Sequence, residues 1–279
     1  MNLNSIRRQI LFSTVRLDND KTSGIPETGT GFLVMGYLDD GRGCPVVITN
    51  KHVVADAAKL TARFIARKPG VDEPNLGQEA EVKLPTDTWV GHPNDRVDVA
   101  AIPLGHGWDE IIKHCYNRVL PMSMLSTDTE DLEIDAIEEV TFVGYPSGLH
   151  DPKHFTPIAR RGITATPIDM DMGGDPAFWV DGSVFGGSSG SPVYILDDRQ
   201  PKPRFALVGI IAAAMQRLDK LPVRVGYAPH VDMAQALNLG VAFNARAIRE
   251  TLETLMATAG GRIKPLGAAE TEALTASAE

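Results

Sequence analysis

Three short stretches of the sequence carry side chains that suit nucleophilic catalysis. His52 follows a run of β-branched residues, Asp98 lies in the apolar run 97–102, and Ser189 lies in the glycine-rich run 186–190. A carboxylate in an apolar strand is costly unless it accepts hydrogen bonds, so Asp98 needs a partner. Glycines beside a serine let the backbone turn tightly and expose the hydroxyl and nearby N–H groups, which suits a nucleophile with an oxyanion hole.

These residue types match the needs of acyl transfer. A serine hydroxyl is a weak nucleophile at neutral pH, so it needs a base that takes its proton and an acid that orients the base and stabilises its charged form. His52, Asp98 and Ser189 fit these roles as base, orienting acid and nucleophile. Asp56 and Asp95 are alternative acids, but only Asp98 lies within an apolar run. Because the base must be neutral, activity should rise with pH.

The elements that position these residues are expected to be mostly strands. Short runs rich in Val and Ile alternate with Gly, Pro, Asn and Asp, which is typical of strands joined by turns. The first set of predicted strands is 10–17, 31–37, 45–49, 59–67, 80–84 and 97–103, and the second is 139–145, 160–166, 177–180, 193–195, 206–214 and 223–229. Two β halves of similar size follow from this pattern.

The segments outside the strands complete the predicted organisation. Apolar residues recur at helical spacing near the C-terminus, at Ile248, Leu252, Leu255 and Met256, and predict an amphipathic helix that packs against the second half. The predicted units are a first barrel at 1–110, a connector at 111–135, a second barrel at 136–240, a C-terminal helix at 241–261 and a flexible tail at 262–279.

Composition argues against several functional classes. The chain has 279 residues, with 27 Lys and Arg against 36 Asp and Glu, and this net charge of −9 does not favour nucleic-acid binding. No apolar run reaches the roughly eighteen residues of a membrane span. The N-terminus is too polar for a signal peptide, and Cys44 and Cys115 are too few for a disulfide scaffold, so we expect a cytoplasmic protein.

No cofactor or metal is expected from the sequence. The histidines other than His52 lack companion Cys or Glu residues at metal-ligand spacing. The run 186–190 is rich in glycine, but a phosphate-binding loop would end in Gly-Lys-Ser or Gly-Lys-Thr and continue into a helix. Pro192 and the apolar residues after it predict a strand instead, which excludes the nucleotide-binding interpretation.

The three stretches resemble motifs of the chymotrypsin-like serine peptidases, in particular the bacterial high-temperature-requirement type. Their order of histidine, aspartate and serine is the order of that family, and the resemblance covers roughly residues 8–240. Residues 28–32 resemble the family's early Gly-Ser-Gly-Phe turn. Residues 181–192 align without a gap to its run ending in Gly-Asn-Ser-Gly-Gly-Pro, which puts Ser189 at the nucleophile.

The resemblance implies two packed, antiparallel, six-stranded β-barrels with the catalytic residues in the cleft between them. It also implies an oxyanion hole formed by the N–H groups of Gly187 and Ser189. Two departures stand out. Ser188 replaces the aspartate that pairs with a newly cut N-terminus in the secreted branch, so activation by that ion pair is not available. Ala212 replaces a serine that often supports the aspartate, so Asp98 needs another donor.

The same alignment predicts the substrate pocket. It places Ser183 at the pocket base, Ala212 and Ala213 on the strand beside the cleft, and Ala214 and Gly226 at the walls. A neutral base does not offset the desolvation of a cation, and the methyl group of Ala214 narrows the pocket. We therefore expect Leu, Met or Val before the cut bond. Asp181 would favour basic side chains if it turned into the pocket.

The sequence thus predicts an all-β serine endopeptidase that cleaves polypeptides through an acyl-enzyme on Ser189. One alternative is a catalytically silent module of the same fold that binds peptides in the cleft, and a weaker alternative is an esterase. After residue 240 only 279 − 240 = 39 residues follow, too few for an appended PDZ domain of about a hundred residues. Whether a regulatory protein partner triggers activity is left open.

Overall fold

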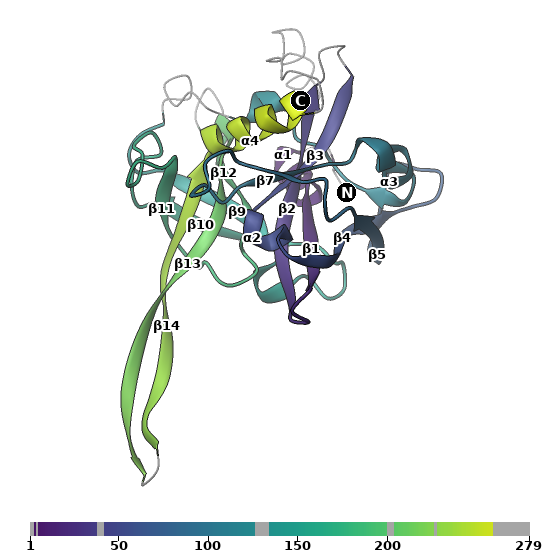
Figure 1. Ribbon diagram of the computed structural model, residues 1–279. Coiled ribbons are helices and arrows are strands. Elements are labelled where there is room, and N and C mark those ends of the chain that lie inside the picture. The colour runs from purple at the N-terminus through teal and green to yellow at the C-terminus, as the bar shows by residue number, and fades with distance from the viewer. Residues whose placement is uncertain are drawn as a thin grey trace.

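The chain folds into two antiparallel β-sheets with a helix packed against both (Figure 1). The structure is a computed structural model that describes residues 3, 5–37, 42–125, 134–199, 204–225 and 228–258. The flexible tail predicted at 262–279 lies outside the described residues. The β content of both halves agrees with the turn-punctuated pattern of the sequence.

The first half contains two helices and most of one sheet. Its elements are α1 (Ile6–Phe12), β1 (Thr14–Lys21), β2 (Pro26–Tyr37), β3 (Gly43–Thr49), α2 (Lys51–Val54), β4 (Ala57–Arg67), β5 (Pro74–Leu84), β6 (Val90–Gly91) and β7 (Ala100–Pro103). Strand β3 is buried on both faces. Val46 and Ile48 point into the core shared with the second half, whereas Val47 points into the core of the first half. This explains its continuous β-branched run.

The first sheet is open, so the prediction of two closed barrels is wrong for this half. Its strand order is β5-β4-β1-β2-β3-β7-β6, and β8 (Cys115–Tyr116) pairs with β4. Among the described residues, no ladder joins β5 to β6. The physical reason is that β6 has only two residues, so beyond its pairing with β7 it is too short to extend a ladder to β5.

Two predicted strands of the first half begin later than expected. Residues 6–12 form helix α1, and the strand predicted at 10–17 starts only at Thr14. The strand predicted at 97–103 starts at Ala100, because Val97 and Val99 are held in turns by backbone hydrogen bonds from Val97 to Asn94 and from Val99 to Val97. Asp98 therefore lies in a turn that leads into the strand.

A connector with short helices leads to the second half, which forms a closed six-stranded barrel as predicted. The connector contains η1 (Gly105–Gly107), α3 (Trp108–His114), β8 and η2 (Met122–Met124). The second half contains β9 (Glu139–Gly144), η3 (Pro146–Gly148), β10 (Ile158–Thr164), β11 (Ala177–Gly182), β12 (Pro192–Asp197), β13 (Arg204–Val225) and β14 (Ala228–Asn244). The barrel order is β10-β11-β14-β13-β12-β9.

Strands β13 and β14 continue far beyond the barrel as a two-stranded arm (Figure 1). The sequence predicted strands at 206–214 and 223–229, yet the observed ladder runs from Gly209 opposite Asn244 to Val225 opposite Ala228. The pairing of β14 with β11 ends at Leu239, so the arm beyond it is joined only by its own ladder in the described residues. Pairing thus continues past prolines that mark turns in the sequence.

The C-terminal helix α4 (Ala245–Thr258) ties the two halves together. Its apolar face is buried as predicted, through Ile248, Leu252, Leu255 and Met256. The helix contacts β13 and β14 of the barrel and also β2, β6 and β7 of the first sheet, so it packs against both halves and not the second alone. A hydrogen bond of 2.7 Å between Nε2 of buried His92 and Oε2 of Glu250 adds a polar link.

The cysteines carry no evident chemistry. Cys44 and Cys115 are both free thiols, and burial raises the pKa of Cys115 to about 11, which keeps it protonated at neutral pH. In the part of the chain that the structure describes, no cluster of three or more His, Cys, Asp or Glu side chains suits a metal ion. No helix among these residues is long and apolar enough to cross a membrane.

Candidate active site

His52 lies in the short helix α2, where strand β3 ends. Asn50 caps this turn, since its carbonyl accepts a hydrogen bond from the N–H of Val53. The Asn50 side chain also donates to the backbone carbonyl of Asp98 over 2.5 Å and so joins the two segments. Nδ1 of His52 lies 2.5 Å from Oδ2 of Asp98. This contact leaves the other ring nitrogen of His52 without a hydrogen bond among the described residues.

Asp98 is held as a carboxylate by the segment that carries His52. Burial opposes its ionisation, but the hydrogen bonds and charge of His52 and the N–H groups of His52 and Lys51 outweigh burial, so the pKa of Asp98 is lowered. One of these bonds runs 3.1 Å from the His52 N–H to Oδ1. Backbone N–H groups thus provide the donor that Ala212 lacks.

The alternative acids do not contact His52. Asp56 is exposed and has a positive φ of 56°, and its recorded hydrogen bond is through its carbonyl, from the N–H of Thr22. Asp95 is exposed as well. Among the described residues, neither carboxylate forms a hydrogen bond or ion pair with His52, whereas Asp98 forms both.

Ser189 lies on the loop between β11 and β12, and two glycines in left-handed conformations shape this loop. Gly187 has φ +76° and Gly190 has φ +86°. A Cβ at Gly187 would lie 2.7 Å from the N atom of Ser147 and from the carbonyl oxygen of Tyr145, so the position excludes a side chain. In the described part of the chain, the N–H groups of Gly187 and Ser189 make no hydrogen bond, which leaves both as donors for a ligand.

Strand β2 joins this loop to the segment with His52. The N–H of Thr30 donates to the carbonyl of Ser189 over 2.8 Å, and the hydroxyl of Thr30 donates to the carbonyl of Gly187 over 3.1 Å. The neighbouring Gly29 packs so closely on Val53 that a Cβ would lie 2.5 Å from its Cγ1. The structure therefore brings both the loop and helix α2 into contact with strand β2.

The hydroxyl of Ser189 does not point to His52 in this structure. Its Oγ donates to the carbonyl of Ala212 over 3.1 Å. Within the described residues, no hydrogen bond joins Ser189 to His52. Catalytic hydrogen bonds often tighten only when substrate binds, so this arrangement is compatible with a nucleophile in its resting state.

Thr30 is a positioning residue that sequence reasoning missed. Its hydroxyl also accepts a hydrogen bond of 3.0 Å from the N–H of Tyr145, and its carbonyl accepts one of 2.7 Å from the hydroxyl of Thr49. In the sequence it stands out only as part of the turn-like run 28–32. The available signal was that this run resembles a family motif, although nothing in it showed which partners the threonine would hold.

The predicted pocket residues are only partly brought together. Ala212 is buried, Ala213 is exposed and Ala214 packs against the barrel core. Gly226 lies outside the described residues, and the ladder instead places Gly240 opposite Ala214. The long arm explains the difference. It adds residues between Ala214 and the part of β14 that lies opposite, so an alignment without a gap of that length places Gly226 where the structure has Gly240.

Gly240 packs on the loop that leads to Ser189. A Cβ at this glycine would lie 2.7 Å from Cγ2 of Val184 and 3.2 Å from the carbonyl oxygen of Ala213. Val184 is buried, whereas Ser183, predicted at the pocket base, is exposed. The apolar contact beside Ala213 and Ala214 is therefore made by Val184.

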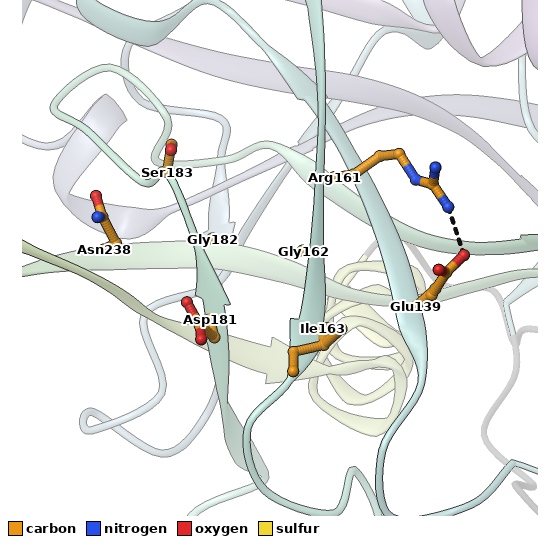
Figure 2. A pocket seen from close by; sticks show the side chains of 8 residues that line it. All are labelled: Glu139, Arg161, Gly162, Ile163, Asp181, Gly182, Ser183 and Asn238. Atoms are coloured by element: carbon orange, nitrogen blue, oxygen red, sulfur yellow. Dashed lines mark hydrogen bonds and ion pairs between the residues drawn. The ribbon is translucent and has the colours of Figure 1, made fainter.

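Ser183 lines a different hollow, on the outer face of the second barrel (Figure 2). It has a volume of about 410 Å³ and is lined by Glu139, Arg161, Gly162, Ile163, Asp181, Gly182, Ser183 and Asn238. None of the three predicted catalytic residues lines it. Arg161 and Glu139 form an ion pair at one side, while Asp181 is exposed on the strand that leads to Ser183.

Comparison with known proteins identifies the family. The profile of the trypsin-like peptidase domain matches residues 29–200. Among solved structures, the HtrA-type protease AlgW with a tripeptide is similar at a TM-score of 0.51 and 14% identity, covering 97% of this chain and 70% of that chain. No curated protein matches the sequence significantly.

Two further solved structures are similar at a TM-score of 0.46 and 16% identity. The match to the inactive form of a serine-to-alanine mutant of Rv3671c from M. tuberculosis H37Rv covers 90% of this chain and 90% of that chain. The match to Deg5 covers 74% of this chain and 81% of that chain. The profile match spans more than half of the sequence and includes the segments that carry His52, Asp98 and Ser189. The chain therefore belongs to the trypsin-like peptidase family.

Proposed function

We propose that this protein is a serine endopeptidase that hydrolyses polypeptides through an acyl-enzyme on Ser189. The observation that carries the proposal is the 2.5 Å contact between Nδ1 of His52 and Oδ2 of Asp98. A carboxylate on Nδ1 fixes the tautomer in which the other ring nitrogen accepts a proton. The side chains of His52 and Asp98 are 46% and 29% exposed, so a substrate can reach the pair.

Each residue takes one role in the proposed reaction. His52 removes the proton of the Ser189 hydroxyl as the oxygen attacks the peptide carbonyl, and it later gives that proton to the leaving amine. Asp98 stabilises the imidazolium that forms. The N–H groups of Gly187 and Ser189 donate to the oxyanion. Water then attacks the acyl-enzyme with His52 again as the base, which releases the acid product and restores the serine.

The resting contact of Ser189 with Ala212 suggests how substrate binding readies the nucleophile. Strand β12 pairs with β13 as far as Ile210, and the backbone of Ile211 is bonded to Ser191 and Gly190, so a strand edge can begin only at Ala212. An extended peptide that adds to this edge offers N–H groups that compete for the Ala212 carbonyl. Once the carbonyl is taken, the Ser189 hydroxyl is released and can turn to His52. The tripeptide in the AlgW structure supports a polypeptide substrate.

The proposed preference is for a medium-sized apolar residue before the cut bond. Ala213 and Ala214 supply small apolar surface beside the strand edge, and buried Val184 packs against Gly240, which lies opposite Ala214. Discrimination should be loose, since one methylene of fit is worth only about 1–3 kcal/mol. A cleavage profile dominated by Lys or Arg would contradict this preference, and Asp181→Asn would then be the variant to profile next.

Covalent labelling by a fluorophosphonate tests the proposal directly. Wild type and Ser23→Ala, a control in an exposed turn, should be labelled, and Ser189→Ala should not. Wild type should also cleave a peptide library. A folded wild type that binds peptides without being labelled would support the catalytically silent module instead. Turnover of esters without turnover of peptides would support the esterase.

A further inference from the structure

Arg160 lies on β10 with its side chain turned into the mouth of the second barrel. Burial alternates along this strand, so that Arg160 is half-buried and its neighbour Arg161 is exposed. The guanidinium carbon of Arg160 lies 4.7 Å from the ring centroid of Phe142, which is fully buried. This contact holds the cation against the wall of the barrel interior.

The guanidinium of Arg160 donates two hydrogen bonds to the loop that carries the proposed nucleophile. Nη1 donates to the carbonyl of Ser183 over 2.6 Å, and Nη2 donates to Oγ of Ser188 over 3.0 Å. Ser188 is fully buried, and its Oγ also accepts a 3.2 Å bond from the N–H of Phe185. One cation thus connects both ends of the segment that directly precedes Ser189.

Arg160 has no carboxylate partner among the described residues. Burial lowers its pKa to about 10, so it is still charged at neutral pH. Its Nε is buried and makes no hydrogen bond in the part of the chain that the structure describes. Desolvating a cation without an anion costs free energy. The two bonds to the loop are therefore the polar contacts that offset this cost. They connect the Arg160 side chain to the segment that directly precedes Ser189.

We propose that Arg160 is a positioning residue that holds residues 183–188 in the conformation in which the N–H groups of Gly187 and Ser189 face the substrate. The proposal rests on the proposed peptidase function. Ser188 occupies the position where related enzymes carry an aspartate that pairs with a newly cut N-terminus. Here the cation comes from within the folded chain, so the loop is ordered without cleavage of a precursor.

The test compares Arg160→Met with Arg161→Met, a matched control on the exposed side of the same strand. Methionine keeps the packing on Phe142 and removes both hydrogen bonds. Because both lost hydrogen bonds have a charged donor, the rate at which a fluorophosphonate labels Ser189 should fall on the order of 10- to 100-fold in Arg160→Met. The control should stay within about twofold of wild type. Amide hydrogen exchange at 184–189 should accelerate only in Arg160→Met.

Two further variants separate positioning from a loss of folding. Arg160→Lys keeps the cation but donates fewer bonds, so its labelling rate should lie between wild type and Arg160→Met. Ser188→Ala should slow labelling in wild type and much less in the Arg160→Met background, because the two residues share one bond. If Arg160→Met does not fold, Arg160→Lys and Ser188→Ala provide the same comparison.

The two readouts distinguish failure of this proposal from failure of the peptidase assignment. If wild type is labelled and the Arg160 variant is labelled at the same rate, the positioning role is overturned. If wild type is not labelled, the proposed function fails, and amide hydrogen exchange alone tests whether Arg160 holds the loop. Faster exchange at 184–189 in the Arg160 variant would then support the structural role, and unchanged exchange would overturn it.

Discussion

The two halves of the molecule position the proposed catalytic groups in different ways. The open first sheet presents a finished pair, because the ring of His52 contacts Asp98 and the backbone of the same helix holds the carboxylate. The closed second barrel presents Ser189 on a loop whose shape depends on glycines and on bonds from other segments. Two of those bonds come from Thr30 in the first half.

This difference shows which parts of the site are local. His52 and Asp98 are joined by bonds between a short helix and a turn of the first half. The loop that carries Ser189 is held by bonds with several other segments, which include Thr30 on β2, Ser147 on η3, Arg160 on β10 and Ile211 on β13. Changes to the pair should therefore alter chemistry with little effect on folding, while changes to the loop supports should alter both.

Asp98→Asn should have the largest effect on activity with an unchanged fold. The amide of Asn donates to Nδ1 of His52, which leaves the proton on the other ring nitrogen and removes the base. Turnover should fall by roughly 10⁴. Peptide hydrolysis and urea unfolding measure the two quantities. Asp56→Asn is the control, and an equal loss in that variant would contradict the assignment of Asp98 as the orienting acid.

Gly187→Ala should give the next largest loss, now with a cost in stability. The glycine has φ +76°, and the added Cβ would lie 2.7 Å from backbone atoms of Ser147 and Tyr145. The loop must move, and the oxyanion donor moves with it, so activity should fall about 10²–10³-fold. Gly186→Ala is the matched control, because its Cβ would meet open space. Equal activity of the two variants would contradict the oxyanion assignment.

The local motifs account for what the sequence could predict. His52 and Ser189 are recognisable because β-branched and glycine-rich neighbours show how the chain presents each side chain. The buried face of α4 is equally local, since four apolar residues recur at helical spacing. The contact between His52 and Asp98 also agrees with the partner expected for a carboxylate in an apolar run.

Other features depend on pairing between distant segments and were therefore missed. The open edge of the first sheet follows from which strands fail to pair, and the arm follows from a ladder that continues past Pro222. The position of Gly240 beside Ala214 depends on the length of that ladder. The contact of Arg160 with Ser188 spans 28 residues and requires the arginine to face inward, which an isolated charged residue does not indicate.

Thr30→Val tests the bonds between the halves. Valine has nearly the same shape but no hydroxyl, so Gly187 loses a donor and the buried N–H of Tyr145 loses its acceptor. The free energy of unfolding should fall by about 1–3 kcal/mol, measured by urea denaturation. Thr28→Val on the same strand should cost less. A similar small cost for both variants would mean that the loop does not depend on this support.

Acid should remove the small electrostatic contribution that the pair of His52 and Asp98 makes to the free energy of unfolding. The pKa of Asp98 is lowered from its ordinary value of 3.8 in the folded protein, so its charge stabilises the fold above that pH, and the contribution is lost as pH falls through the folded value. The difference in unfolding free energy between wild type and Asp98→Asn should therefore shrink below about pH 4. A difference that does not change with acid would contradict the lowered pKa.

The arm should contribute least to stability, although it is built from the same strands as the barrel. An isolated two-stranded hairpin is marginally stable in water. Replacing 217–235 by Asn-Gly would close the ladder directly after Gln216 and Ala236, which face each other. Calorimetry should show an unchanged or slightly higher melting temperature, and fluorophosphonate labelling should be retained because the strand edge beside Ser189 is kept.

Gly240→Val makes the opposite change on the part of β14 that closes the barrel. Its Cβ would press on Val184, so this variant should be strongly destabilised, by an overpacking cost of about 1–3 kcal/mol. The arm deletion and Gly240→Val together compare how much the arm and the barrel part of β14 contribute to stability. A large loss of stability on removal of the arm would mean that the arm packs on the rest of the molecule in solution, since its own ladder is too weak to explain such a loss.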